Sequence, residues 1–101
     1  MNKLEKALQE CDVDVRDKFL YLDDILCDIE DEIMVLHEEI TYVEVDIEIA
    51  KRIHSTKFQE DYAIAILADK KKVFEEELEY LNVKYDVVEE MYEEIMLKLL
   101  K

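Results

Sequence analysis

Apolar residues recur along most of the chain at alternating steps of three and four positions. The first series consists of Phe19, Leu22, Leu26, Ile29, Ile33, Leu36, Ile40, Val43, Ile47 and Ala50. The second consists of Phe74, Leu78, Leu81, Tyr85, Val88, Tyr92, Ile95 and Leu99. This spacing is typical of α-helices that pack on each other along a seam. The sequence therefore predicts two long amphipathic helices, whose apolar series we call the first and second seams.

The interval between the two seams predicts where the chain reverses. Thr56 followed by Gln59 fits a capping box, in which two side chains satisfy free backbone donors at the start of a helix. We predict one helical domain over residues 1–101, with a helix at about 2–53, a turn at about 54–57 and a helix at about 57–99. The fold class is therefore all-α, a long antiparallel helical hairpin, with a three-helix bundle as the alternative.

Two irregular places keep that alternative open. Consecutive steps of four, from Cys11 to Val15 and from Val15 to Phe19, form a stutter that locally unwinds a coiled coil. We expect a kink or a new helix start at about residues 12–18. The sequence leaves open whether residues 1–12 continue the first helix. The second place is Ala68-Asp69, ahead of Lys70, which falls on the apolar face. We favour a continuous helix there, because the three lysines at 70–72 would oppose the dipole of a helix that began at this point.

The amino-acid composition supports long helices. The chain has no Gly and no Pro, and β-rich folds depend on such residues for tight turns. Half of the residues are apolar, more than a single seam of a hairpin uses. The surplus predicts a second interface.

A second apolar stripe lies on nearly the opposite face of the first predicted helix. Its residues are Tyr42, Val45, Ile49 and Ile53. A helix with two apolar faces must be covered twice, and the hairpin covers only one of them. We expect a second copy of the chain to cover the other, giving a homodimeric four-helix bundle. The alternative is that the N-terminal segment folds back over this stripe.

Acidic residues dominate the charge. The net charge is −15, which argues against direct contact with nucleic acid or with an anionic membrane surface and favours a basic protein as the partner. No Lys or Arg occurs between Lys18 and Lys51, or within residues 85–97. The acidic residues that we predict to bind this partner are Asp23, Asp24, Asp28, Asp31, Glu38, Asp86, Glu89 and Glu93. The simpler explanation is that the charge only keeps the protein in solution.

Carboxylates one helical turn apart are about 5–6 Å from each other, which is of the order of the spacing between phosphates in a nucleic-acid strand. We therefore predict an inhibitor or decoy of a basic, nucleic-acid-handling protein. In charge and helicity, the chain resembles viral inhibitors that mimic DNA, and its Gly- and Pro-free composition would suit a viral or mobile-element protein. The alternative is a small escort chaperone or assembly subunit that binds a helical client through its second apolar stripe.

Residues that could support enzymatic chemistry are few. His37 begins a sequence similar to that of zinc proteases, but Thr41 stands where the second His is required. Cys11 and Cys27 have acidic neighbours that oppose thiolate formation, and they are too far apart on one helix to form a disulfide. We predict no enzymatic activity, no metal or cofactor and no small-molecule substrate. Without an apolar leader or spanning segment, we expect a cytoplasmic protein.

Overall fold

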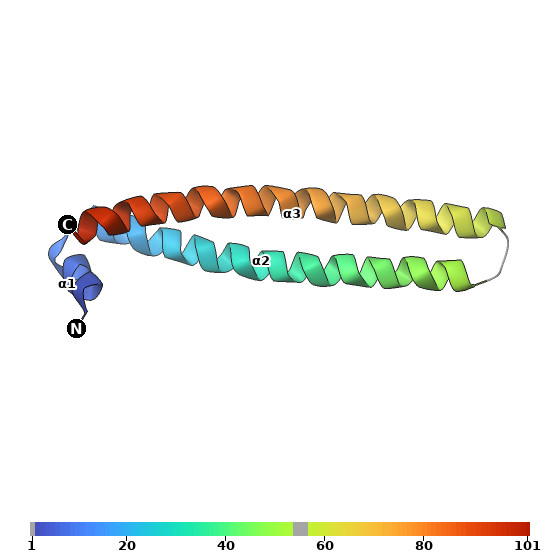
Figure 1. The fold of residues 1–101 in the computed structure, drawn as a ribbon, viewed down its shortest axis with the longest axis horizontal. Helices are drawn as coiled ribbons and strands as arrows, with labels where there is room; N and C mark the ends of the chain where they lie inside the picture. Colours follow the sequence, from blue (N-terminus) through green and yellow to red (C-terminus); the bar gives the residue numbers. More distant parts are fainter. Residues whose placement is uncertain (1, 54–56) are drawn as a thin grey trace. The chain divides into compact units, whose positions relative to one another are not determined.

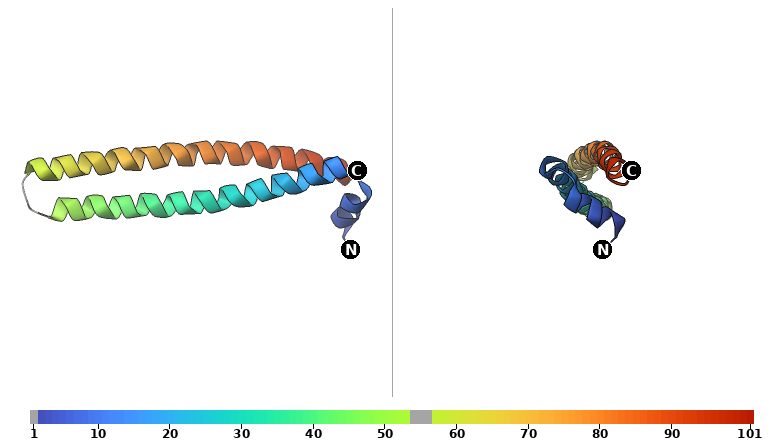
Figure 2. Two further views of the ribbon diagram at one scale, coloured as in Figure 1. Left: turned by 180° about the vertical axis from the view of Figure 1, so that it is seen from behind. Right: turned by 90° about the vertical axis from the view of Figure 1, so that its left-hand side faces the viewer.

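The structure is a computed structural model, which describes residues 2–53 and 57–101. Its helices are α1 (Lys3–Glu10), α2 (Val13–Arg52) and α3 (Lys57–Leu99) (Figure 1). The two long helices lie side by side and run antiparallel (Figures 1 and 2), which confirms the predicted all-α helical hairpin. Of the predicted turn, residues 54–56, including Thr56 of the capping box, lie outside the described residues.

The short helix α1 is separated from α2 by two residues. Asn2 caps it, since the side-chain oxygen of Asn2 accepts a hydrogen bond from the Glu5 N–H at 2.8 Å. Cys11 has extended backbone angles and ends α1, although its N–H still donates to the Ala7 carbonyl. The Asp12 carbonyl then accepts the first hydrogen bond of α2, from the Arg16 N–H. The chain therefore breaks its helix at residues 11–12, where β-branched and Asp residues begin to follow one another.

The chain divides into two compact units, and α2 and α3 run through both. The terminal unit consists of Met1–Asp31 and Asn82–Lys101, and the central unit consists of Glu32–Leu81. In the terminal unit, the buried side chains are Phe19, Leu22, Leu26, Ile29 and Val88. In the central unit, they are Leu36, Val43 and Leu81. All of these are residues of the two predicted seams, and the remaining seam residues are half-buried.

The second seam continues towards the start of α3 through Lys71, Leu67 and Ile64, which are half-buried in the central unit. Lys71 is half-buried, whereas Lys70 is exposed, so the sequence-based placement of Lys70 on the apolar face is wrong by one residue. The reason is that the alternating steps require a step of three, not four, before Phe74. The Lys71 Nζ lies 3.2 Å from the Glu44 Oε1 and 3.7 Å from the Glu75 Oε1. This residue therefore links α2 to α3, and α3 passes through Ala68-Asp69 without a break.

Candidate functional site

The two segments without Lys or Arg come together in the terminal unit. Residues 19–31 of α2 lie beside residues 85–97 of α3, because the ring of Phe19 stacks on that of Tyr92 with a centroid distance of 4.4 Å. A second contact joins them further along, where the Tyr85 hydroxyl donates a hydrogen bond of 2.9 Å to Glu30. The paired segments contain ten acidic residues and no basic one: Asp23, Asp24, Asp28, Glu30, Asp31, Asp86, Glu89, Glu90, Glu93 and Glu94.

Five of these carboxylates share one side of the helix pair. Each of them directly follows a seam residue, and they are Asp23, Glu30, Asp86, Glu89 and Glu93. In an antiparallel pair, positions that directly follow the seam on either helix lie on the same side of the pair. Glu30 from α2 and Glu89 from α3 both interact with Tyr85, in agreement with this placement. We call these five residues the acidic face.

Three side-chain pKa values are raised at this surface, in each case partly by the negative charge of these carboxylates. The hydrogen bond to Glu30, followed by lost hydration and the charge of Glu30, raises the pKa of Tyr85 to about 12. Lost hydration is the main cause that raises the pKa of Tyr92, and the charge of Asp23 adds to it. The pKa of Cys27 is raised for the same two reasons, with Asp23 the largest of its four charged neighbours. The surface therefore opposes further negative charge and favours cations.

The structure groups half of the eight predicted acidic residues in the acidic face. Asp23, Asp86, Glu89 and Glu93 belong to the acidic face, and Glu89 is the one that is half-buried. The predicted residues Asp24, Asp28 and Asp31 do not directly follow a seam residue; they are exposed elsewhere on α2 of the same unit. Glu38 lies in the central unit and is not part of this group. Glu30 was missed, although it stands seven residues after Asp23 in the first segment without basic residues.

The central unit differs in its surface charges. The three ion pairs found among the described residues all lie there, formed by Arg52 with Glu48 and by Lys71 with Glu44 and Glu75. In this unit, carboxylates are therefore partly neutralised by neighbouring cations. The acidic face has no such cation within the two segments that form it.

The predicted apolar stripe of the central unit is exposed in the single chain. The exposed fractions are 57% for Tyr42, 52% for Val45, 50% for Ile49 and 58% for Ile53. Within the central unit, no described segment covers these four side chains. The stripe is therefore available to a partner or to a second copy.

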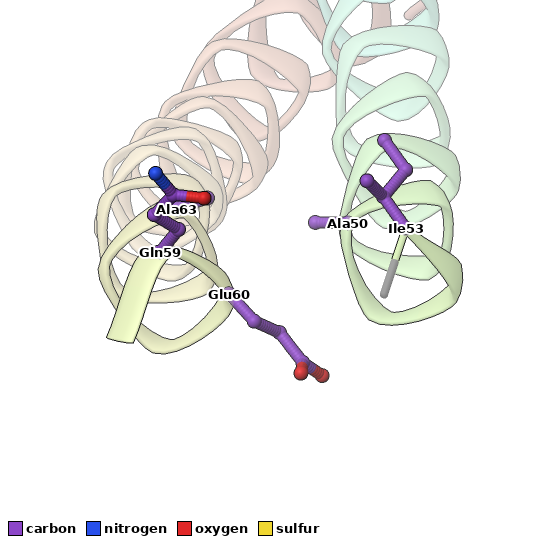
Figure 3. A pocket seen from close by; sticks show the side chains of 5 residues that line it. All are labelled: Ala50, Ile53, Gln59, Glu60 and Ala63. Carbon is purple, nitrogen blue, oxygen red and sulfur yellow. The ribbon is translucent and has the colours of Figure 1, made fainter. Parts of the chain in front are cut away.

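A hollow of about 220 Å³ opens between α2 and α3 at the end of the stripe (Figure 3). It is lined by Ala50 and Ile53 from α2 and by Gln59, Glu60 and Ala63 from α3. Two alanines face the gap from opposite helices, and their short side chains leave part of it unfilled. Its small size and open position favour a surface depression over an enclosed ligand site.

The residues considered for zinc or thiol chemistry have other surroundings in the described part of the chain. There, no three His, Cys, Asp or Glu side chains are placed to hold a metal ion. Thr41, which stands in place of the second zinc-ligating His, donates its hydroxyl hydrogen to the His37 carbonyl at 2.9 Å. Cys11 and Cys27 are both free thiols.

Comparisons with protein-family models, with curated proteins and with solved structures gave no match to the chain. None of the described helices has the length and uninterrupted apolar character needed to cross a bilayer. The functional argument therefore depends on the geometry and the charges described above.

Proposed function

We propose that this chain is a non-enzymatic binding protein whose acidic face engages a basic, nucleic-acid-handling protein in place of nucleic acid. One observation carries the proposal: the two segments without basic residues, from opposite ends of the sequence, lie side by side in the terminal unit. Ordinary helices mix charges of both signs, because pairs of opposite charge four residues apart are stabilising. Residues 19–31 and 85–97 contain no Lys or Arg, so neither segment has such a pair within itself.

The arrangement suits a partner that normally binds phosphates. Carboxylates on adjacent turns of both helices form a surface of closely spaced negative charges, and such a field speeds the approach of a positively charged protein. The Tyr85 hydroxyl stays protonated well above neutral pH, so it remains a neutral group among the carboxylates. A cytoplasmic setting is consistent with the two free cysteines.

Competition with DNA tests the proposal. A fluorescent DNA duplex would be bound to each of several basic DNA-binding proteins, and the chain would be added at low and at high salt. We expect the chain to displace DNA from at least one of them, with an affinity that falls steeply as the salt concentration rises. Displacement from none of these proteins, or displacement that does not depend on salt, would contradict a phosphate-mimicking role.

Matched variants locate the effect. Asp23→Asn, Asp86→Asn and Glu93→Gln together remove three exposed charges from the acidic face. Glu38→Gln, Glu76→Gln and Glu79→Gln remove three exposed charges from the central unit. The first triple variant should lose at least tenfold in competing affinity and the second much less, with the same helical circular dichroism. Equal losses would indicate that net charge, and not the acidic face, is responsible.

A second candidate function is an escort chaperone or assembly subunit, and the exposed stripe of the central unit favours it. Binding of an apolar client through Val45 and Ile49 would be tolerant of salt. The variant Val45→Lys with Ile49→Lys would abolish such binding, whereas the acidic-face variant would leave it unchanged.

A further inference from the structure

Exposed apolar side chains follow both helices of the central unit at steps of seven residues. On α2 they are Val35, Tyr42 and Ile49, and on α3 they are Ile66, Val73 and Tyr80. Each of the six is at least half exposed, with fractions from 50% to 66%. A step of seven is also the repeat of the buried seams, so each series stays in line along a coiled helix. The three residues of α3 are not part of the stripe predicted from the sequence.

The two series lie on one side of the helix pair. All six residues directly precede a seam residue, whereas Glu44 and Glu75 directly follow one. Glu44 and Glu75 come from different helices and both reach Lys71, so positions that follow the seam share a side. Positions that precede the seam must share the opposite side.

Exposed apolar residues that lie at the same level, meaning the same position along the axis of the helix pair, are complementary in size. The contact between Glu44 and Lys71 fixes the register of α2 against α3. Tyr42 precedes Glu44 by two residues and Val73 follows Lys71 by two, so Tyr42 and Val73 are at one level. By the same register, Ile49 is level with Ile66, and Val35 is level with Tyr80. Each level thus combines an aromatic with a β-branched residue, or two isoleucines.

We propose that a second copy of the chain covers this side of the central unit, with α2 of each copy packed on α3 of the other. A two-fold axis parallel to the helices places Tyr42 of one copy over Val73 of the second copy and Ile49 over Ile66. Val35 then lies over Tyr80, and every level is filled by one large and one smaller residue or by two of equal size. The result is a four-helix bundle with an isologous interface.

Charge selects this arrangement over the one that packs α2 on α2. Between Phe19 and Ala50, α2 carries acidic residues and no basic one, so two copies of this helix would repel each other. On α3, Lys70 directly precedes the seam position of Lys71, so it lies on the same side as the two apolar series and level with the acidic part of α2 in the central unit. Packing α2 on α3 therefore brings opposite charges together.

The exposed area is consistent with a second copy. The chain exposes 7693 Å². A compact monomer of 12.1 kDa is expected to expose roughly 6,000 Å². The excess is roughly 1,700 Å² for one chain, which is more than the roughly 800 Å² that each partner buries in a standard protein interface.

The test measures the mass of the full chain by light scattering and sedimentation over a wide range of concentration. The wild-type chain should have twice the mass of one 12.1 kDa chain. Ile49→Lys with Val73→Lys places two charges in the interface and should weaken the dimer at least a hundredfold. Met34→Lys with Ala65→Lys is the matched control, because both residues are exposed, lie on the same two helices and directly follow a seam residue. This control should remain dimeric, and all variants should keep their helical circular dichroism.

Cross-linking tests the pairing of α2 with α3. In a chain with Cys11→Ser and Cys27→Ser, Tyr42→Cys and Val73→Cys would be made separately and mixed under oxidising conditions. The mixed disulfide between the two variants should form in excess over both symmetric ones. A monomeric wild-type chain, equal effects of the test and control pairs, or a majority of symmetric disulfides would overturn the proposal. None of these results depends on the acidic face, so the proposed function is tested separately.

Discussion

The terminal and central units are built from the same two helices, yet they differ in surface charge and in the packing of their cores. The terminal unit places ten carboxylates on paired segments without a cation, and beneath them it has five buried side chains and an aromatic stack. The central unit has three ion pairs, three buried side chains and a hollow between two alanines. The better-filled core lies where like charges are concentrated.

This difference shows how a helical hairpin can remain folded with a surface that carries only negative charges. Repulsion among exposed carboxylates disfavours the paired state of the helices, and it is offset by apolar burial underneath. In the central unit, neighbouring cations reduce that repulsion, so a seam containing Lys71 and small residues suffices. Truncation of a core side chain should therefore lower the free energy of unfolding most when the residue lies in the terminal unit.

The largest effect is expected for Phe19→Ala. Phe19 is 3% exposed and stacks on Tyr92, so its loss leaves a cavity and should cost about 3–5 kcal/mol of unfolding free energy. Val43→Ala is the counterpart in the central unit, where a 2% exposed residue loses fewer carbons and should cost about 2 kcal/mol. Urea denaturation of both variants compares them. A greater loss for Val43→Ala would refute the idea that the terminal core offsets the charge.

The next effect is expected at Lys71. Lys71→Glu would place a third carboxylate beside Glu44 and Glu75, and thermal unfolding should shift down by several degrees. Lys71→Met would continue the apolar seam and should leave the midpoint unchanged or raise it, because exposed ion pairs contribute little. The midpoints are measured by circular dichroism. If both variants lose stability equally, the ion pairs themselves hold the central unit together.

A smaller effect is expected at high pH in the terminal unit. The pKa of Tyr85 is raised from 10.0 to about 12, so its protonated form is favoured by folding. The resulting stability is present in full below pH 10 and is lost as the pH rises through about 12. Titration of tyrosinate absorbance should show a group that titrates at about pH 12, and Glu30→Gln should move this group to lower pH. A titration unchanged in that variant would contradict the assigned hydrogen bond.

The smallest effect is expected from adding one cation to each unit. Asp28→Lys creates pairs with Asp24 and Glu32 four residues away, and it should stabilise the chain by about 0.5–1 kcal/mol. In the central unit, Glu76→Lys places a lysine four residues after Lys72 and should give no gain. Denaturation at low salt separates the two variants, and high salt should remove most of the difference.

Much of the fold could be predicted from the sequence, because a seven-residue apolar repeat specifies both helix and buried face. All eighteen residues of the two seams are buried or half-buried, as the repeat predicts. The placement of Lys70 failed because a lysine at the seam gives no apolar signal, and only the register to Glu44 identifies Lys71.

The surfaces could be predicted only in part. Acidic residues were identified from segments that lack Lys and Arg, but composition along one helix does not show which carboxylates share a side with those of the other. Glu30 and the α3 series of Ile66, Val73 and Tyr80 became recognisable once the antiparallel register was known. A surface of repeated carboxylates contains no local sequence pattern that would specify one partner.

The order in which the chain closes follows from this register. Ala50 and Ala63 are near in sequence, whereas Tyr85 and Glu30 are 55 residues apart. Closing a long loop costs more entropy than closing a short one, so the helices should zip from the central unit towards the chain ends during folding. The acidic face would then be the last surface to assemble and the first to be lost on unfolding, and a truncation of either end would remove it while sparing the central unit.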